Sequence, residues 1–226
     1  MFPLKDTIPS STFPFVTISI IVTNIFIFIY QLSLGPQLNE FFNHFGVIPV
    51  KFTSVASENP VQLIPLSATL FSSVFLHGGW MHIIGNMWYL WIFGDNIEDR
   101  TGHFRFLLFY LLCGIAAGLV HIIMNPGSGV PTIGASGAIA GVMGAYILLF
   151  PNSRVITLIF VIFFIQIVEI PAIFFLGFWI IIQIISGSMQ AGLTEQSGGV
   201  AWWAHIGGFF IGLLLVLFFK KRKSRK

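Results

Sequence analysis

Hydrophobic positions along this chain gather into long runs, which short polar or proline-rich stretches interrupt. About 20 apolar residues in an α-helix cross the hydrocarbon layer of a bilayer, so runs of this length indicate membrane-spanning helices. The pattern predicts six such helices, over residues 15–34, 80–94, 104–124, 136–150, 171–186 and 201–219. We therefore expect an all-α, polytopic membrane protein in which residues 1–226 form a single membrane domain.

The start of the fifth helix depends on two residues, Glu169 and Pro171, within a long apolar stretch. One tilted helix over the whole stretch would place Glu169 inside the lipid, at a cost of about 2.5–3.5 kcal/mol. Proline suits the first turn of a helix, and an acid is favourable beside a helix N-terminus. We therefore predict that the fifth helix begins at Pro171, and that residues 155–170 lie along the cytoplasmic side.

The amino-acid composition is that of a protein whose surface is partly solvated by lipid. Hydrophobic residues make up 56% of the chain and charged residues only 8%, against about 25% charged in soluble domains. A soluble core of this size could not hide so much apolar surface. The single cysteine, Cys113, excludes an intrachain disulfide.

The distribution of basic residues predicts the orientation. With six spans, ten of the 11 lysines and arginines fall on the side of the termini, and only Lys51 falls opposite. Because basic residues favour the cytoplasmic side, we expect a cytoplasmic N-terminal segment, 1–14, and a basic cytoplasmic tail, 220–226. Because membrane orientation accounts for the basic tail, we expect no nucleic-acid partner. The compact form without a transit peptide favours the plasma membrane.

Three polar side chains on separate predicted helices fall at a similar depth. At 1.5 Å per residue, Ser136 and His205 lie about 22 Å, and His82 about 20 Å, from the cytoplasmic ends of their helices. Small residues, mostly glycine, line the fourth and sixth helices and allow close approach. We expect these side chains to meet in one polar site towards the outer face.

The residue types at this site are those of nucleophilic catalysis. A serine that begins a helix has an unpaired backbone N–H, which is a ready oxyanion donor, and a histidine within reach can accept the serine proton. His82 and Asn86, one turn apart, can aim two further donors at the same point. No acid lies at the depth of His205, so the pattern favours a Ser136–His205 dyad over a triad. No zinc, paired-aspartate or phosphate-loop motif is present.

Several of these motifs, taken in order, resemble the rhomboid proteases of bacteria. Residues 134–137 read Gly-Ala-Ser-Gly, like the family's Gly-x-Ser-Gly, and 82–86 read His-Ile-Ile-Gly-Asn, like His-x-x-x-Asn. Residues 204–208 resemble the family's Ala-His-x-x-Gly, and the stretches 75–82 and 93–99 are also similar. The resemblance covers roughly residues 63–212, on the expected spans.

The resemblance implies a six-helix rhomboid-like bundle that opens to the extracellular or periplasmic side. It also implies hydrolysis of peptide bonds near the end of a substrate's transmembrane helix, through an acyl-enzyme and without metal or cofactor. By position, Ser136 would be the nucleophile and His205 the general base, while His82, Asn86 and the Ser136 amide would stabilise the oxyanion. Ala140 departs from an aromatic that stacks on the histidine in some members, so His205 must be held in another way.

The expected partners are the lipid bilayer and single-span membrane proteins whose helices unravel near the outer surface. We expect these substrates to enter beside the fifth helix, near Phe178, Trp179 and Ile182. An alternative is a non-catalytic rhomboid-like protein that binds or escorts membrane proteins. A small transporter is disfavoured, because no inverted repeat or mid-membrane charge is present. The oligomeric state stays open.

Other polar and aromatic residues have simpler expected roles. Glu98, Asp99 and Arg100 are expected in a solvated turn that caps the third helix. Five of the six tryptophans are expected to face lipid or anchor the interface: Trp88, Trp91, Trp179, Trp202 and Trp203.

Overall fold

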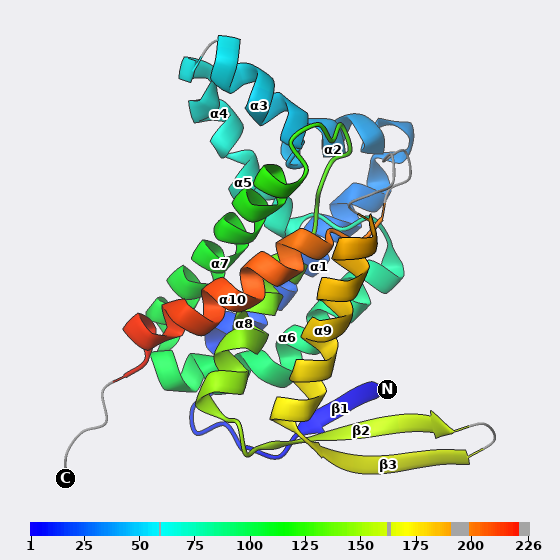
Figure 1. Ribbon diagram of the computed structural model, residues 1–226, viewed down its shortest axis with the longest axis vertical. Helices are drawn as coiled ribbons and strands as arrows, with labels where there is room; N and C mark the ends of the chain where they lie inside the picture. Colours follow the sequence, from blue (N-terminus) through cyan, green and yellow to red (C-terminus); the bar gives the residue numbers. More distant parts are fainter. Residues whose placement is uncertain (59, 162–163, 191–198, 222–226) are drawn as a thin grey trace.

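The computed structural model describes residues 1–58, 60–161, 164–190 and 199–221, so most of the predicted basic tail, 222–226, lies outside the described residues. Six long helices form the bundle in Figure 1. They are α1 (Phe15–Ser33), α6 (Trp80–Thr101), α7 (His103–Met124), α8 (Ser136–Leu149), α9 (Ala172–Gln190) and α10 (Trp202–Phe219). Each corresponds to one of the six predicted helices.

The helices differ in how they satisfy the requirements of a membrane span. By length and hydropathy, α1, α7, α9 and α10 can each cross a membrane. Helix α6 qualifies only together with the segment Pro60–Phe75, which meets it at a bend of 83°, and the apolar α8 is shorter than a full span. The chain is thus a helical, multi-pass membrane protein, as predicted.

Helix α8 lies at the centre of the bundle and is buried from Gly137 to Tyr146. Its glycines let α10 approach until the two backbones touch. A Cβ atom added at Gly208 would lie 2.1 Å from the carbonyl oxygen of Gly137, and one at Gly212 would lie 2.2 Å from that of Gly141. Any side chain here would separate the helices, so the predicted small-residue interface is confirmed.

Short helices between α1 and α6 hold the loop that leads into α8. They are α2 (Leu38–Phe45), α3 (Pro49–Glu58), α4 (Leu63–Ser67) and α5 (Thr69–Ser72), with 3-10 turns at Gly35–Gln37, Pro60–Gln62 and Ser73–Phe75. Val47 and Thr132 exchange two backbone hydrogen bonds, and Gly134 N–H donates to the Ser73 carbonyl at 2.9 Å. These bonds satisfy backbone groups that this partly buried loop would otherwise leave unpaired.

A three-stranded antiparallel sheet at one end of the bundle was not predicted. It consists of β1 (Phe2–Asp6), β2 (Arg154–Val161) and β3 (Phe164–Pro171), in that order. In Figure 1 the β2–β3 hairpin projects past the start of α9. The β-branched residues of 154–171 favour strands, and hydropathy alone did not reveal this. The predicted start of the fifth helix is nevertheless confirmed, since Pro171 ends β3 and α9 begins at Ala172.

Strand β1 is anchored to the bundle by polar contacts. The indole N–H of Trp88 donates to the Pro3 carbonyl at 2.7 Å. The Asp6 carboxylate accepts hydrogen bonds from the Tyr146 hydroxyl and from the Asn96 amide. Burial raises the pKa of Asp6 to about 6, although the hydrogen bond from Tyr146 acts in the opposite direction.

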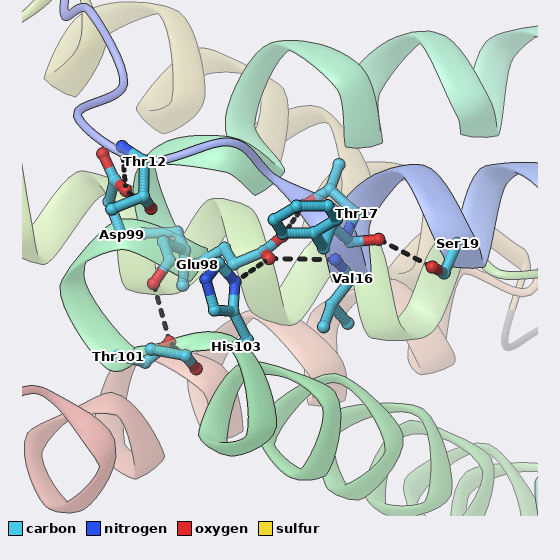
Figure 2. Close-up of polar contacts among 11 residues, drawn as sticks. Thr12, Val16, Thr17, Ser19, Glu98, Asp99, Thr101 and His103 are labelled. Carbon is cyan, nitrogen blue, oxygen red and sulfur yellow. Dashed lines mark hydrogen bonds and ion pairs between the residues drawn. The ribbon is translucent and has the colours of Figure 1, made fainter.

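The acidic pair at the end of α6 caps α1, as Figure 2 shows. Glu98 is only 1% exposed. Its carboxylate accepts the N–H of Val16 at 2.9 Å and the N–H and hydroxyl of Thr17 at 2.8 and 2.7 Å. Asp99 accepts backbone and hydroxyl hydrogen bonds from Ser11 and Thr12. A carboxylate at a helix N-terminus satisfies the free N–H groups and complements the helix dipole.

The expectation of a solvated turn at Glu98, Asp99 and Arg100 is therefore wrong. The three residues belong to the last turns of α6, and the helix that the acids cap is α1. Glu98 also lies beside His103 at the start of α7, with 2.5 Å between Oε1 and Nδ1. One buried carboxylate thus contacts the start of α1, 81 positions away, and the start of α7, which follows α6 directly. Only the contact with α1 was beyond the reach of local sequence pattern.

Replacing Glu98 with alanine should lower the free energy of unfolding by about 3 kcal/mol, because buried N–H groups lose their acceptor. Denaturation in detergent micelles, followed by circular dichroism, measures this loss. Glu169→Ala is the matched control, since its ion pair with Arg154, at 3.4 Å, is exposed and should contribute less than about 1 kcal/mol. Equal losses in the two variants would contradict the capping role of Glu98.

Asp6 should make stability depend on pH. The pKa of an aspartate in the unfolded chain is about 3.9, whereas that of Asp6 in the folded chain is about 6. Between these two values the folded chain holds a proton that the unfolded chain has released. The free energy of unfolding should therefore fall as pH rises through this window and level off above it. Asp6→Asn should remove this component and be more stable at pH 7 by about 1 kcal/mol, allowing for partial solvent exposure. Identical pH dependence in both proteins would contradict the assignment.

Candidate active site

Ser136 and His205 form a hydrogen-bonded pair in the interior of the bundle. Ser136 is the first residue of α8, and His205 lies in the first turn of α10. The Ser136 Oγ and His205 Nε2 atoms are 2.8 Å apart. Gly208 follows His205 at the spacing of one helical turn, so the close helix contact and the histidine share a face of α10. The predicted meeting of these two residues is thus present.

The backbone before Ser136 is arranged in a way that only glycine adopts easily. Gly134 has a φ of +128°, and a Cβ atom there would lie 2.6 Å from His82 Nε2. The chain can therefore pass directly beside His82 and then enter α8 at Ser136. Because Ser136 begins the helix, its backbone N–H has no partner within the helix and is available to an incoming oxygen.

His82 and Asn86 lie beside this loop on α6. The backbone N–H of Gly78 donates to His82 Nδ1 at 3.3 Å, which leaves the proton of a neutral ring on Nε2. That nitrogen is the one that a Cβ atom at Gly134 would meet, at 2.6 Å. The Asn86 amide nitrogen is buried without a hydrogen-bond partner among the described residues. The side-chain nitrogens of His82 and Asn86 therefore both lie beside Gly134, two positions before Ser136, within 2.6 and 3.7 Å of where a Cβ atom would stand.

His205 is held from its other side by helix α9. Its Nδ1 atom lies 2.7 Å from the side-chain oxygen of Gln183. The ring of Trp179 packs against the imidazole with centroids 5.8 Å apart. Ala140 supplies no aromatic contact from α8, and Trp179 packs there from α9 instead. Trp179 therefore has an inward role as well, where the sequence predicted only a lipid-facing or gate position.

All four predicted polar residues line one cavity of about 600 Å³. The walls come from α6, α8, α9, α10 and the loop before α8, and they include Tyr89, Met143 and Trp202. Among the predicted gate residues, Trp179 lines the cavity, whereas Phe178 and Ile182 are 53% and 39% exposed on α9. The cavity thus combines apolar walls with a few convergent polar groups, as ligand sites do.

Sequence reasoning missed Gln183, which is buried in the middle of α9. The signal was available, because a polar residue inside an otherwise apolar span needs a partner. It also missed the contribution of Val47, which lies outside the motifs picked out in the sequence and pairs with Thr132 in the loop before α8.

Comparison with known proteins places these features in a family context. Residues 67–222 match the family model of the Rhomboid domain. The chain is 29% identical over 205 residues to Rhomboid-like protein 11, chloroplastic, of Arabidopsis thaliana, covering 87% of this chain and 65% of the relative. It is 27% identical over 162 residues to Rhomboid protein 1, mitochondrial, of Saccharomyces cerevisiae, covering 70% of this chain and 43% of the relative.

A relative whose name states an activity is Rhomboid protease GluP of Bacillus subtilis. The chain is 30% identical to it over 146 residues, which cover 65% of this chain and 26% of the relative. The chain thus spans less than two thirds of the length of each of these three relatives.

Gly134→Ala should lower the free energy of unfolding by about 1–3 kcal/mol, because alanine is strained at this φ and its methyl group would push His82 away. Denaturation in detergent micelles tests this expectation. Gly127→Ala, in the same loop, is the control because a Cβ atom there meets nothing within 4 Å. Similar stability of the two variants would show that Gly134 imposes no such constraint.

Proposed function

Because this chain belongs to the rhomboid family, we propose that it is an intramembrane serine endopeptidase that cuts membrane proteins in or next to their transmembrane segments. The observation that carries the proposal is the 2.8 Å hydrogen bond between Ser136 and His205 inside a helical membrane protein. A serine hydroxyl is a weak nucleophile until a neighbouring base accepts its proton. His205 is within reach to act as that base.

In the proposed reaction, Ser136 Oγ attacks the carbonyl carbon of the scissile bond while its proton passes to His205 Nε2. The tetrahedral intermediate then collapses, and His205 delivers the proton to the leaving amine. Ser136 stays esterified to the other half of the substrate. A water molecule, deprotonated by His205, hydrolyses this ester and restores the serine. A dyad suffices for both proton transfers.

The negative oxygen of the intermediate needs hydrogen-bond donors that are already in place. We assign this role to His82 Nε2–H, the Asn86 amide and the backbone N–H of Ser136. The unpartnered Asn86 nitrogen and the hydrogen bond that fixes the His82 tautomer support the assignment. Donors that need no reorganisation stabilise the transition state most, and the loss of one such donor costs about 10²–10³-fold in rate.

The substrates in this proposal are transmembrane helices that unravel near the membrane surface, because a helical peptide bond is blocked by its own hydrogen bonds. We propose that they enter beside α9, past Phe178, Trp179 and Ile182. The exposed positions of Phe178 and Ile182 and the cavity-lining position of Trp179 support this route.

We further propose that the protein lies in the plasma membrane with both termini in the cytoplasm. The distribution of lysine and arginine supports this orientation. Strand β1 and the end of α10 lie at the same end of the bundle, where Lys221 N–H donates to the Arg100 carbonyl at 2.8 Å. The site would then open on the extracellular or periplasmic side.

A fluorophosphonate probe, which reacts with activated serines, should label the purified protein in detergent and in bilayers. Ser136→Ala should abolish labelling, and His205→Ala should slow it by at least about 10²-fold, since general-base help is worth about 10²–10⁴-fold. Ser188→Ala, at an exposed position on α9, is the control and should label like the wild type. The rate of label incorporation, resolved by gel fluorescence, is the measurement.

Failure of folded wild-type protein to react in bilayers would contradict the proposal. It would favour the alternative of a rhomboid-like protein that binds membrane proteins without cutting them. Labelling that persists in Ser136→Ala would place the nucleophile elsewhere.

A further inference from the structure

We propose that Gln183 is a positioning residue that holds His205 in the one tautomer able to accept the Ser136 proton. The inference deepens the proposed function and rests on it for its kinetic consequence. Its structural content, the tautomer of His205, can be tested separately. Consecutive hydrogen bonds connect three side chains, those of Ser136 on α8, His205 on α10 and Gln183 on α9.

Both ring nitrogens of His205 are engaged. Nε2 lies 2.8 Å from Ser136 Oγ, and Nδ1 lies 2.7 Å from the side-chain oxygen of Gln183. Gln183 is 5% exposed and sits in the interior of α9. A polar side chain buried in a membrane helix needs a partner, and for the oxygen of Gln183 that partner is His205.

The orientation of the Gln183 amide follows from its second contact. Its nitrogen donates to the backbone carbonyl of Trp179 at 3.4 Å, so the nitrogen faces the helix and the oxygen faces the imidazole. The reverse orientation would set two oxygens against each other. The network thus determines which end of the amide meets His205.

An amide oxygen can only accept a hydrogen bond, so the proton of neutral His205 must be on Nδ1. Nε2 then carries a lone pair and accepts from the Ser136 hydroxyl, as a general base requires. In the other tautomer, the Nδ1 lone pair would face the Gln183 oxygen, and Nε2–H would point at the serine. Gln183 therefore selects the productive form of the ring.

A neutral amide performs this task without burying a charge. In serine protease triads a carboxylate orients the histidine, and an acid at mid-membrane depth costs at least about 2.5–3.5 kcal/mol. No carboxylate contacts His205 within the described ranges. Ala140 cannot stack on the imidazole, and Trp179 packs on it at an interplanar angle of 35°. Such packing holds the plane of the ring but does not select which nitrogen carries the proton, so the hydrogen bond to Gln183 makes that selection. The amide thus orients the base at a lower desolvation cost.

The placement of Gln183 on α9 links the base to the proposed entry route. Gln183 follows Trp179 by one helical turn and is adjacent to Ile182. Displacement of α9 away from α10 would separate the Gln183 oxygen from His205. The base is therefore oriented only while α9 is packed against α10.

The test uses Gln183→Leu, which removes the acceptor at similar volume, and Gln183→Glu, which keeps an acceptor for Nδ1–H. Ile184→Leu, on the exposed side of α9, is the matched control. Fluorophosphonate labelling of Ser136 should slow by about 10²-fold in Gln183→Leu. It should stay within about 10-fold of wild type in Gln183→Glu and be unchanged in Ile184→Leu. Near-normal labelling of Gln183→Glu together with slow labelling of Gln183→Leu would show that Gln183 acts by accepting the Nδ1–H of His205 and not by filling space.

Nitrogen-15 NMR of protein labelled at histidine gives the second readout, with His205→Ala used to assign the signals. Wild type should show Nδ1 of His205 protonated and Nε2 bare, and Gln183→Leu should lose this preference. If Gln183→Leu does not fold, as judged by thermal denaturation, Gln183→Met supplies the same comparison.

The outcomes separate the two proposals. Wild-type labelling that depends on Ser136, together with an equally fast Gln183→Leu, would overturn the role of Gln183 and leave the protease intact. A protonated Nε2 in the wild type would overturn it as well. Absence of labelling in the wild type would overturn the protease proposal, and the NMR tautomer would still decide the role of Gln183.

Discussion

Helices α8 and α10 pack so closely that carbonyl oxygens of α8 lie where side chains of α10 would begin. Gly208 and Gly212 on α10 face Gly137 and Gly141 on α8, and none of these positions has room for a Cβ atom. Lipid tails are as apolar as the helices, so close packing of this kind is what drives association within a membrane. The same contact brings His205 to Ser136, since both residues lie in the first turns of the two helices. The close packing of α8 and α10 therefore determines both the geometry of the site and the stability of the bundle.

Polar groups in this structure divide into those that the protein satisfies and those that it leaves free. Glu98 accepts hydrogen bonds from the first turn of α1, and that pairing joins the ends of helices. His205 is paired on both ring nitrogens, which gives it one orientation. The Asn86 amide nitrogen, in contrast, is buried beside the cavity with no hydrogen-bond partner in the part of the chain that the structure describes. An unpaired buried donor is costly, so its place beside the cavity agrees with the oxyanion role proposed for it.

The sheet shows how local preference and hydropathy can diverge. The apolar stretch from 155 to 170 reads as a membrane-associated segment, yet its described residues, 155–161 and 164–170, belong to β2 and β3. Their β-branched side chains favour extended backbone, and β1 from the opposite end of the chain completes the ladder. Strands β1 and β2 lie far apart in the sequence, with Phe2 paired to Leu158, so their pairing is a tertiary event. Contacts of Pro3 with Trp88 and of Asp6 with Asn96 attach β1 to helix α6 of the bundle.

The sequence by itself determined the helical class, the six helices, the break before α9 and the candidate site residues Ser136, His205, His82 and Asn86. These follow from the length of apolar runs, from the cost of a charge in lipid and from short motifs, all of which are local properties. Only the tertiary structure decided which polar residues meet. Gln183 reaches His205 across 22 positions, and Glu98 reaches Thr17 across 81. Such pairings depend on the rotation of each helix about its axis, which packing sets, because a membrane span can present any face to its neighbours.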